Sequence, residues 1–338
     1  MENAVILCVL NEEERGDFLP LDLWSGVEEL GRPLQHLLTP LPEGRSFSER
    51  LIESKVKILL SGWSTPALPA DLPVGGEGQL KYVCHLTGSV KKQIPRELIE
   101  RGLRVTNWGN SASRTVAECG LLLILSALRR SSHWAVAMHR DGLWKDRYHV
   151  VTESLFERSV GLHGFGAVAR ELALLLQPFA CRISTHSPGV GDDILARYGV
   201  KMAASPEELF SSNDIIVEAA ALTPQTYRMV DEKLLRCIKP GGVFVNIGRG
   251  AVVDEAALAR VAAEKQIQVA LDVYDVEPLP VESPLRGLPN VTLLPHIAGP
   301  TKDRRRDCGR AALNNLSRFL KNEPLESEVT LEVYDSIT

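Results

Sequence analysis

Short apolar runs recur along the first third of the chain, separated by turn-rich or amphipathic stretches. Apolar runs of this length between turn signals are typical of buried strands. Strands that alternate with helices usually form a parallel sheet with helices on both faces. The predicted strands of this part are Ala4–Leu10, Val56–Leu60, Leu80–Cys84 and Leu103–Thr106.

A second alternating series begins at Ser159. Helical patterns lie between its apolar runs, at Pro206–Phe210, Asp231–Ile238 and Asp254–Glu264. Six strands in this order are what a doubly wound nucleotide-binding domain requires. The predicted strands are the one that begins at Ser159, before the glycine turn, and then Cys181–Thr185, Asp214–Glu218, Gly242–Ile247, Gln268–Val273 and Val291–Leu294.

Two longer helical patterns indicate how the domains connect. With 338 residues the chain exceeds the size at which one core usually stops growing, so two domains are expected. We predict that a helix over Ala112–Arg130 links them and that the helix over Thr301–Leu320 returns to the first. Residues 111–297 are then a nucleotide-binding domain inserted into a discontinuous domain of residues 1–110 and 298–338.

The segment after the strand at Ser159 has the form G-x-G-x-x-A, from Gly164 to Ala169. In such a turn the first glycine permits a sharp bend, and the second lets backbone N–H groups approach a pyrophosphate. The helix N-terminus that follows adds unpaired donors and a partial positive charge. An ordinary βα turn fits the glycines alone equally well, so the βαβ context carries the interpretation.

The end of the next strand bears on the cofactor. An NAD-binding unit usually has an acidic residue about 20 positions beyond the glycines, where it binds the ribose hydroxyls. Here that position is Ser187. A serine leaves no carboxylate to repel a 2′-phosphate, but no Arg or Lys follows closely to attract one. The sequence therefore leaves both NAD and NADP possible as the cofactor.

Composition narrows the class of protein. The chain is 44% hydrophobic and 24% charged, as in ordinary globular proteins, and a net charge of -5 favours neither nucleic acid nor an anionic membrane as partner. Six cysteines without a C-x-x-C pair indicate reduced thiols and no metal site. Met1–Leu10 lacks the basic region of a signal peptide, and the apolar run Cys119–Leu128 is too short for a bilayer. We expect a cytoplasmic protein.

Several separated motifs share one order and spacing with a known family. The chain resembles the D-isomer-specific 2-hydroxyacid dehydrogenases, which include phosphoglycerate dehydrogenase and the glyoxylate/hydroxypyruvate reductases. The likeness extends from about Leu80 to the C-terminal helix. The motifs are Gly164-Phe165-Gly166, Asn246-Ile247-Gly248-Arg249-Gly250, Leu271-Asp272-Val273, Glu277-Pro278 and Pro295-His296-Ile297-Ala298-Gly299.

The resemblance implies a catalytic set of Arg249, Glu277 and His296. The activity implied is NAD(P)-dependent interconversion of a 2-oxo acid and a D-2-hydroxy acid. A guanidinium matches a carboxylate in a planar, bidentate way, and an imidazole can exchange a proton near neutral pH. A glutamate beside the imidazole fixes its tautomer. Singly, these residues also suit surface ion pairs or caps, but as a matched set they favour catalysis.

The resemblance further implies a smaller flavodoxin-like α/β substrate domain and a homodimer that binds a small-molecule acid. Asp272 is expected near the nicotinamide, although an aspartate here also suits a loop cap. The substrate carboxylate is expected at the backbone of Gly88, Ser89 and Val90. Two alternatives stay open: a dinucleotide-sensing scaffold like the corepressor in this family, and a formate dehydrogenase. The expected cofactor-binding residues are Gly164, Phe165, Gly166, Ala167, Val168, Ser187, Ala221, Ile247, Gly248 and Asp272.

Overall fold

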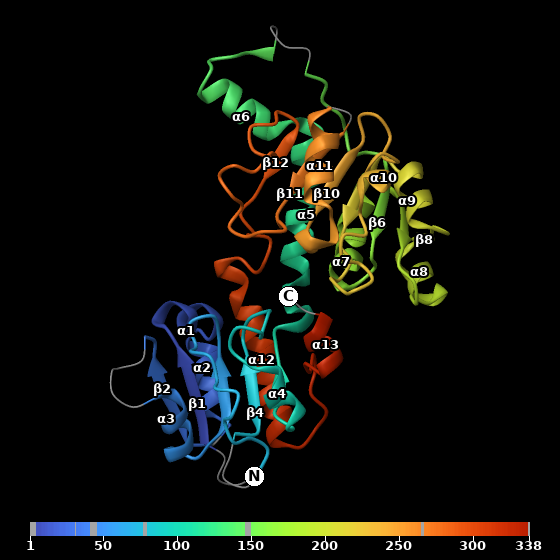
Figure 1. Ribbon diagram of the computed structural model, residues 1–338. Helices are drawn as coiled ribbons and strands as arrows, with labels where there is room; N and C mark the ends of the chain where they lie inside the picture. Colours follow the sequence, from blue (N-terminus) through green and yellow to red (C-terminus); the bar gives the residue numbers. More distant parts are fainter. Residues whose placement is uncertain are drawn as a thin grey trace. The chain divides into compact units, whose positions relative to one another are not determined.

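The computed structural model describes residues 5–30, 32–40, 46–76, 80–145, 150–264 and 267–336 (Figure 1). Two compact units divide the chain: the split unit, Met1–Ala112 with Pro300–Thr338, and the central unit, Ser113–Gly299. The predicted junctions after residues 110 and 297 lie two residues before the observed ones, after residues 112 and 299. Each unit has its own sheet and its own core.

The split unit contains a parallel sheet of five strands in the order β2-β1-β3-β4-β5. This is the flavodoxin-like order, as predicted. The sequence pattern did not reveal β2, because this edge strand is only partly buried and lacks a continuous apolar run. The strands are β1 (Val5–Leu10), β2 (Leu34–Leu38), β3 (Val56–Ser61), β4 (Tyr82–His85) and β5 (Arg104–Thr106).

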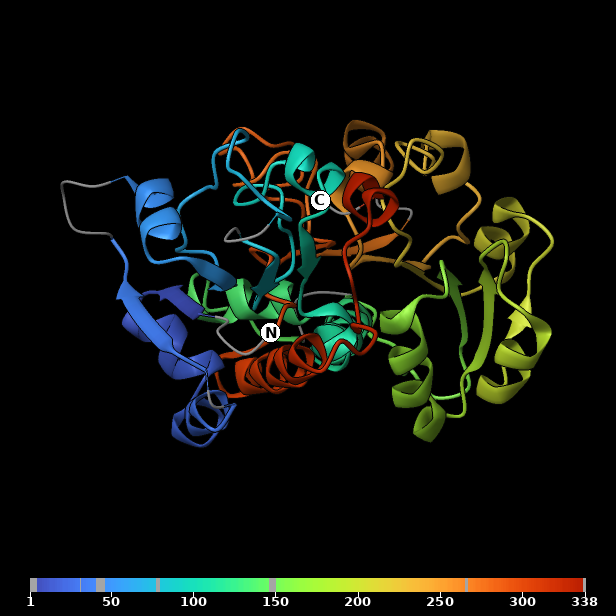
Figure 2. The same ribbon diagram turned by 90° about the horizontal axis from the view of Figure 1, so that it is seen from below.

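The C-terminal helix of the chain belongs to the split unit. Figure 2 shows this helix, α12 (Arg305–Leu320), in red beside the blue N-terminal helices, and it packs against α1, α2 and β4. Gly309 permits the approach, because a Cβ there would lie 1.7 Å from the carbonyl oxygen of Phe18. The predicted helix begins in a 3₁₀ turn, η5 (Lys302–Arg304). The other helical segments are α1 (Glu12–Phe18), α2 (Leu21–Glu28), α3 (Phe47–Glu53), α4 (Arg96–Glu100), η1 (Gly109–Ala112) and α13 (Leu331–Ser336).

The central unit contains a parallel sheet of seven strands in the order β12-β11-β10-β9-β6-β7-β8. From β8 to β11 this is the doubly wound order 3-2-1-4-5-6, and β12 adds an edge strand. The pattern did not reveal β8, which has two residues, both exposed. The strands are β6 (Ser159–His163), β7 (Arg182–His186), β8 (Lys201–Met202), β9 (Ile215–Glu218), β10 (Val243–Asn246), β11 (Gln268–Leu271) and β12 (Val291–Leu293).

The long apolar helix of the central unit is α5 (Ser113–Arg129). With the turn before it, Gly109–Arg129 is long and apolar enough to cross a membrane, at a mean hydropathy of 1.3. In the fold, however, α5 packs against α7, β10 and β11, which accounts for its apolar composition. The other helical segments are α6 (Ser131–His139), α7 (Ala167–Leu176), η3 (Gln177–Phe179), α8 (Asp192–Tyr198), α9 (Pro206–Ser212), α10 (Glu232–Leu235), η4 (Gly250–Val252) and α11 (Glu255–Ala263).

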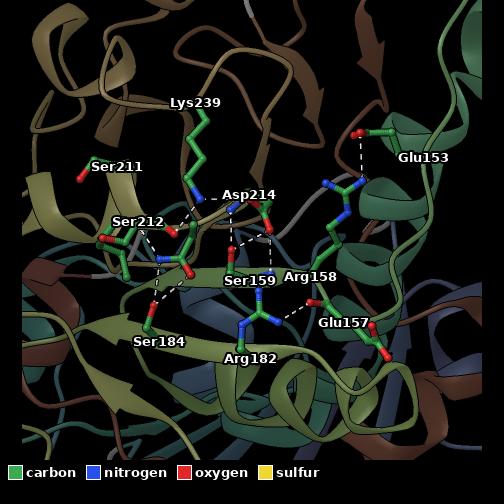
Figure 3. Close-up of polar contacts among 12 residues, drawn as sticks. Glu153, Glu157, Arg158, Ser159, Arg182, Ser184, Ser211, Ser212, Asp214 and Lys239 are labelled. Atoms are coloured by element: carbon green, nitrogen blue, oxygen red, sulfur yellow. Dashed lines mark hydrogen bonds and ion pairs between the residues drawn. The ribbon is translucent and has the colours of Figure 1, made fainter.

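A polar network joins the starts of β6 and β9 (Figure 3). Asp214 accepts hydrogen bonds from the backbone N–H and the hydroxyl of Ser159, at 3.0 and 2.7 Å, and from Lys239 at 3.1 Å. Burial opposes ionisation of Asp214, but the hydrogen bonds from Ser159 and Lys239 outweigh it and lower its pKa to about 2. The network holds the amino-terminal edge of the sheet, opposite the glycine turn.

Candidate active site

The glycine turn connects β6 to α7. Gly164 has a φ of +85°, and a Cβ there would lie 2.7 Å from the Cα of Ala220, in the loop after β9. Glycine is therefore required both by the backbone conformation and by the close contact. The N–H of Gly164 donates to the carbonyl of His186 at 3.0 Å. The turn thus contacts the last residue of β7 and the loop that follows β9.

The turn leaves room for an anionic group at the start of α7. Gly166 is the N-cap of α7, and a Cβ there would meet no atom within 4 Å. The side chain of Phe165 is buried against Tyr198, so only its backbone faces the turn. Ala167 and Val168 form the first, partly exposed turn of α7. Open space above unpaired helix N–H groups fits a dinucleotide pyrophosphate.

The other predicted cofactor-binding residues follow strands at the same carboxyl-terminal edge. Ser187 follows β7 and is partly exposed, and Ala221 is exposed in the loop after β9. After β10, Gly248 lies close to this loop, because a Cβ there would be 3.1 Å from the carbonyl oxygen of Ala220. The side chain of Ile247 packs instead on α5, near Gly120. Only the backbone of Ile247 is therefore suited to contact a cofactor.

Arg249 lies in a loop that Asn246 shapes. The buried side chain of Asn246 accepts from the N–H of Gly248 at 3.0 Å and donates to the carbonyl of Arg249 at 3.1 Å. The guanidinium donates to the carbonyl of Gly248 at 2.7 Å. Burial lowers the pKa of Arg249, and the nearby Glu277 carboxylate raises it. Sequence reasoning assigned Asn246 no role, although an Asn side chain often accepts a hydrogen bond from the backbone N–H two residues further on.

Close backbone packing brings the Arg249 loop against the loop after β11. A Cβ at Gly250 would lie 1.9 Å from the carbonyl carbon of Tyr274. No side chain fits there, so glycine is required for the contact. The N–H of Tyr274 in turn donates to Glu277 at 3.0 Å. The chain therefore places Arg249 and Glu277 on two loops in direct contact.

His296 and Glu277 form a hydrogen-bonded pair. His296 follows β12 with a φ of +55°, and its Nδ1 lies 2.6 Å from an oxygen of Glu277. The His296 side chain is 50% exposed. With Nδ1 bound to a carboxylate, Nε2 is the ring atom left to exchange a proton with a ligand. This arrangement is typical of an imidazole that acts as a general acid or base with an orienting carboxylate.

Asp272 fixes the segment that carries His296. The Asp272 side chain is buried, and its two oxygens accept from the N–H groups of Ile297 and Ala298, at 2.8 and 2.9 Å. Burial raises the pKa of Asp272, while these two hydrogen bonds lower it. The structure thus shows the loop-capping role that the sequence left open. A contact to the nicotinamide stays a prediction.

The predicted substrate loop belongs to the split unit and follows β4. Val90 is buried in the core, and a Cβ at Gly88 would lie 2.6 Å from the ring of Trp108. His85, buried at the end of β4, lies 2.8 Å from the hydroxyl of Ser61 and 2.6 Å from that of Thr87. Burial lowers the pKa of His85 to about 4, so it is neutral at physiological pH. Nothing in the sequence distinguished His85 from an ordinary strand-end histidine.

The site residues therefore fall into two groups. Arg249, Asp272, Glu277 and His296 lie at the carboxyl-terminal edge of the central sheet with the glycine turn, where doubly wound domains bind ligands. Gly88, Ser89 and Val90 lie at the corresponding edge of the sheet in the split unit. The contact between Glu277 and His296 directly joins two of the three predicted catalytic residues.

The chain is similar in sequence to a known protein family and to curated proteins. Residues 121–298 match the family model described as D-isomer specific 2-hydroxyacid dehydrogenase, NAD binding domain. The chain is 33% identical to glyoxylate/hydroxypyruvate reductase A of Arabidopsis thaliana over 231 residues, 68% of this chain and 72% of that protein. It is 31% identical to glyoxylate reductase/hydroxypyruvate reductase of Homo sapiens over 256 residues, 75% of this chain and 77% of that protein.

A solved structure gives the same result for the fold. The apo form of D-mandelate dehydrogenase from Rhodotorula graminis superposes with a TM-score of 0.82, covering 96% of this chain and 97% of that chain. The two sequences are 23% identical, so this likeness concerns the fold alone. It confirms the predicted α/β class with a doubly wound nucleotide-binding domain.

Proposed function

Because this chain belongs to the D-isomer-specific 2-hydroxyacid dehydrogenase family, we propose that it interconverts a 2-oxo acid and a D-2-hydroxy acid with NAD or NADP. The observation that carries the proposal is the hydrogen bond between His296 and Glu277, beside the loop of Arg249. The three residues together supply a proton-transfer group, its orienting carboxylate and a cation for an acid substrate.

The cofactor would lie along the turn from Gly164 to Val168, with Ser187, Ala221 and Gly248 around it. When bound, a nicotinamide dinucleotide supplies or accepts the hydride. The N–H groups at the start of α7 would hold its pyrophosphate. Asp272 keeps the His296 segment against this edge of the sheet through its bonds to Ile297 and Ala298.

Arg249 binds the carboxylate and carbonyl oxygens of the substrate, where the positive charge also polarises the carbonyl. In reduction, His296 donates a proton from Nε2 to the carbonyl oxygen as that oxygen gains charge. In oxidation, Nε2 accepts the proton of the hydroxyl group. Glu277 holds the ring in its orientation through the bond at Nδ1. Binding of the substrate carboxylate by backbone N–H groups at Gly88 and Ser89 stays a prediction from the sequence.

We propose a small acid as the substrate, with glyoxylate and hydroxypyruvate as the first candidates, and the names of the relatives, glyoxylate and hydroxypyruvate reductases, support this choice. Partly exposed Ser187 in place of an acidic residue leaves the enzyme able to accept NADP as well as NAD. We further expect a homodimer in the cytoplasm, without a nucleic acid or membrane partner. These expectations are separate from the chemistry and are tested by sedimentation and by cell fractionation.

The test is reduction of glyoxylate, hydroxypyruvate, pyruvate and phenylpyruvate with NADH and with NADPH, followed at the absorbance of the reduced nicotinamide. Turnover of at least one acid, with the D-hydroxy acid as product, is expected. Tight dinucleotide binding without any turnover would instead support a sensing scaffold. Oxidation of formate alone would support a formate dehydrogenase. Either result would contradict the proposal.

A further inference from the structure

A buried ion pair lies directly behind the glycine turn and takes no part in the proposed proton transfer. His163 is the last residue of β6 and Glu218 is the last residue of β9. Their side chains are 4% and 0% exposed, and Nδ1 of His163 lies 2.5 Å from an oxygen of Glu218. Buried pairs of this kind are costly to desolvate and are seldom needed for stability alone.

The contacts of the pair extend to two segments predicted to bind the cofactor, the glycine turn and the Ala219–Ala221 loop. The second oxygen of Glu218 accepts from the N–H of Ala220 at 2.8 Å, and the carbonyl of His163 accepts from the N–H of Ala219 at 2.9 Å. Ala220 is the residue against which Gly164 packs. One carboxylate therefore connects the strand before the glycine turn to the loop that contacts this turn.

The groups that face His163 are few. From β9 it meets Glu218, and from β7 the ring of His186 lies nearly parallel at 6.4 Å. From α9 the ring of Phe210 meets it edge-on at 5.9 Å, while Glu207 and Glu208 lie in the exposed first turn of that helix. Burial opposes protonation of His163, but Glu218 outweighs it and raises the pKa of the imidazole. The Glu218 side chain therefore favours the protonated form of this imidazole.

We propose that His163 and Glu218 are positioning residues for the dinucleotide, holding the glycine turn and the Ala219–Ala221 loop in the geometry that binds it. The inference rests on the proposed function for the identity of the cofactor. Two leucines could fill the same volume, but they would leave the N–H of Ala220 without its acceptor and remove the side-chain contact between β6 and β9, so that only the backbone bond from Ala219 to His163 would still join the loop to β6. The expected consequence is weaker cofactor binding in a protein that still folds.

The chain contains a matched control for this role. Ser159 and Asp214 join the same two strands at their opposite ends, with the same separation of 55 residues in the sequence. This second pair, drawn in Figure 3, lies at the edge away from the glycine turn. Weakening it is expected to lower stability without changing the cofactor loops.

The experiment compares the double variant His163→Leu/Glu218→Leu with Asp214→Asn. Dissociation constants for NADH and NADPH are measured by fluorescence titration, and steady-state kinetics give kcat and the cofactor KM. The double variant is expected to bind the cofactor roughly 10-fold more weakly, with kcat at saturating cofactor within about 2-fold of the original. Asp214→Asn is expected to bind as the original protein does, although it unfolds at a lower temperature.

Glu218→Asp keeps the charge but is one methylene shorter, so it cannot contact both His163 and the N–H of Ala220. It is expected to weaken cofactor binding and serves if the double variant does not fold. Unchanged affinity in the folded double variant or in Glu218→Asp would overturn the inference, as would equal weakening in Asp214→Asn. If the original protein binds neither dinucleotide, the proposed function fails as well, and this outcome is distinct from the others.

Discussion

At the scale of single residues, the chemistry depends on which atoms are left after the structural hydrogen bonds are made. Nδ1 of His296 is bound by Glu277, which leaves Nε2 for the substrate. Both oxygens of Asp272 hold the backbone at Ile297 and Ala298. His296 is therefore the proton-transfer candidate, and the two carboxylates position it.

Replacement of His296 tests this division. His296→Ala removes the proton donor and is expected to lower kcat by roughly 100-fold or more, the usual scale for a positioned acid-base group. Cofactor affinity is expected to stay unchanged. The matched control is His139→Ala, at the exposed end of α6. Steady-state kinetics check both variants, and full activity of His296→Ala would show that the donor is elsewhere.

Gly250 gives a second prediction at this scale. Gly250→Ala places a Cβ 1.9 Å from the carbonyl carbon of Tyr274, so the Arg249 and Glu277 loops must separate. Such overlap against backbone typically costs about 1–3 kcal/mol. Both the free energy of unfolding, measured with urea, and kcat are expected to fall. The control is Gly16→Ala, where a Cβ meets no atom within 4 Å, so neither the free energy of unfolding nor kcat is expected to fall. Equal changes in the two variants would contradict the close packing at Gly250.

At the scale of elements, parallel strands place function and stability at opposite edges of one sheet. The site residues follow the strands, whereas Ser159, Asp214 and Lys239 join the turns before them. Substitutions of polar residues at the amino-terminal edge are therefore expected to change the stability of the sheet, while the ligand-binding carboxyl-terminal edge keeps its geometry.

The Asp214 network predicts a pH dependence of stability. The pKa of Asp214 is lowered to about 2 in the folded protein from an ordinary value of 3.8, so the unfolded chain binds more protons between these values. The stabilisation is complete above about pH 4, amounts to about 2 kcal/mol and is lost as the pH falls through 2. The free energies of unfolding of the original protein and of Asp214→Asn, measured with urea, are expected to differ by less as the pH falls from about 4 to 2. A constant difference would contradict the role of the ionised carboxylate.

The elements also show how far a single sequence predicts structure. The glycine turn and the runs of β6, β9 and β10 are recognisable because each has a continuous apolar strand and a local turn signal. The edge strands β2 and β8 lack that run and were missed. Arg249, Glu277 and His296 were identified through motif order, whereas nothing local connects His163 to Glu218.

At the scale of the whole molecule, the chain leaves its first unit and returns to it. The helix α12 supplies Cys308, Ala312, Leu316 and Phe319 to the core around β1, β3 and β4. The central unit has separate cores built from its own residues. The folding of the split unit therefore depends on residues that lie far apart in the sequence.

Truncation after Gly299 tests this dependence. Removing α12 exposes the apolar face of the first sheet, so the split unit is expected to lose cooperative unfolding, while the central unit, with complete cores, keeps its own transition. Circular dichroism and calorimetry would show one transition lost and one retained. Two intact transitions in the truncated chain would contradict the assignment of α12 to the core of the split unit.

The sequence by itself determined the alternation of strands and helices and the glycine turn, because apolar periodicity and turn chemistry are local properties, whereas the set of Arg249, Glu277 and His296 was predicted from the resemblance to a family. Only the tertiary structure decided which polar groups meet. Pairing of β6 with β9 brings His163 to Glu218 across 55 residues, and packing at Gly250 brings the Arg249 loop to the Glu277 loop. Such contacts depend on strand register and backbone approach, which no local pattern encodes.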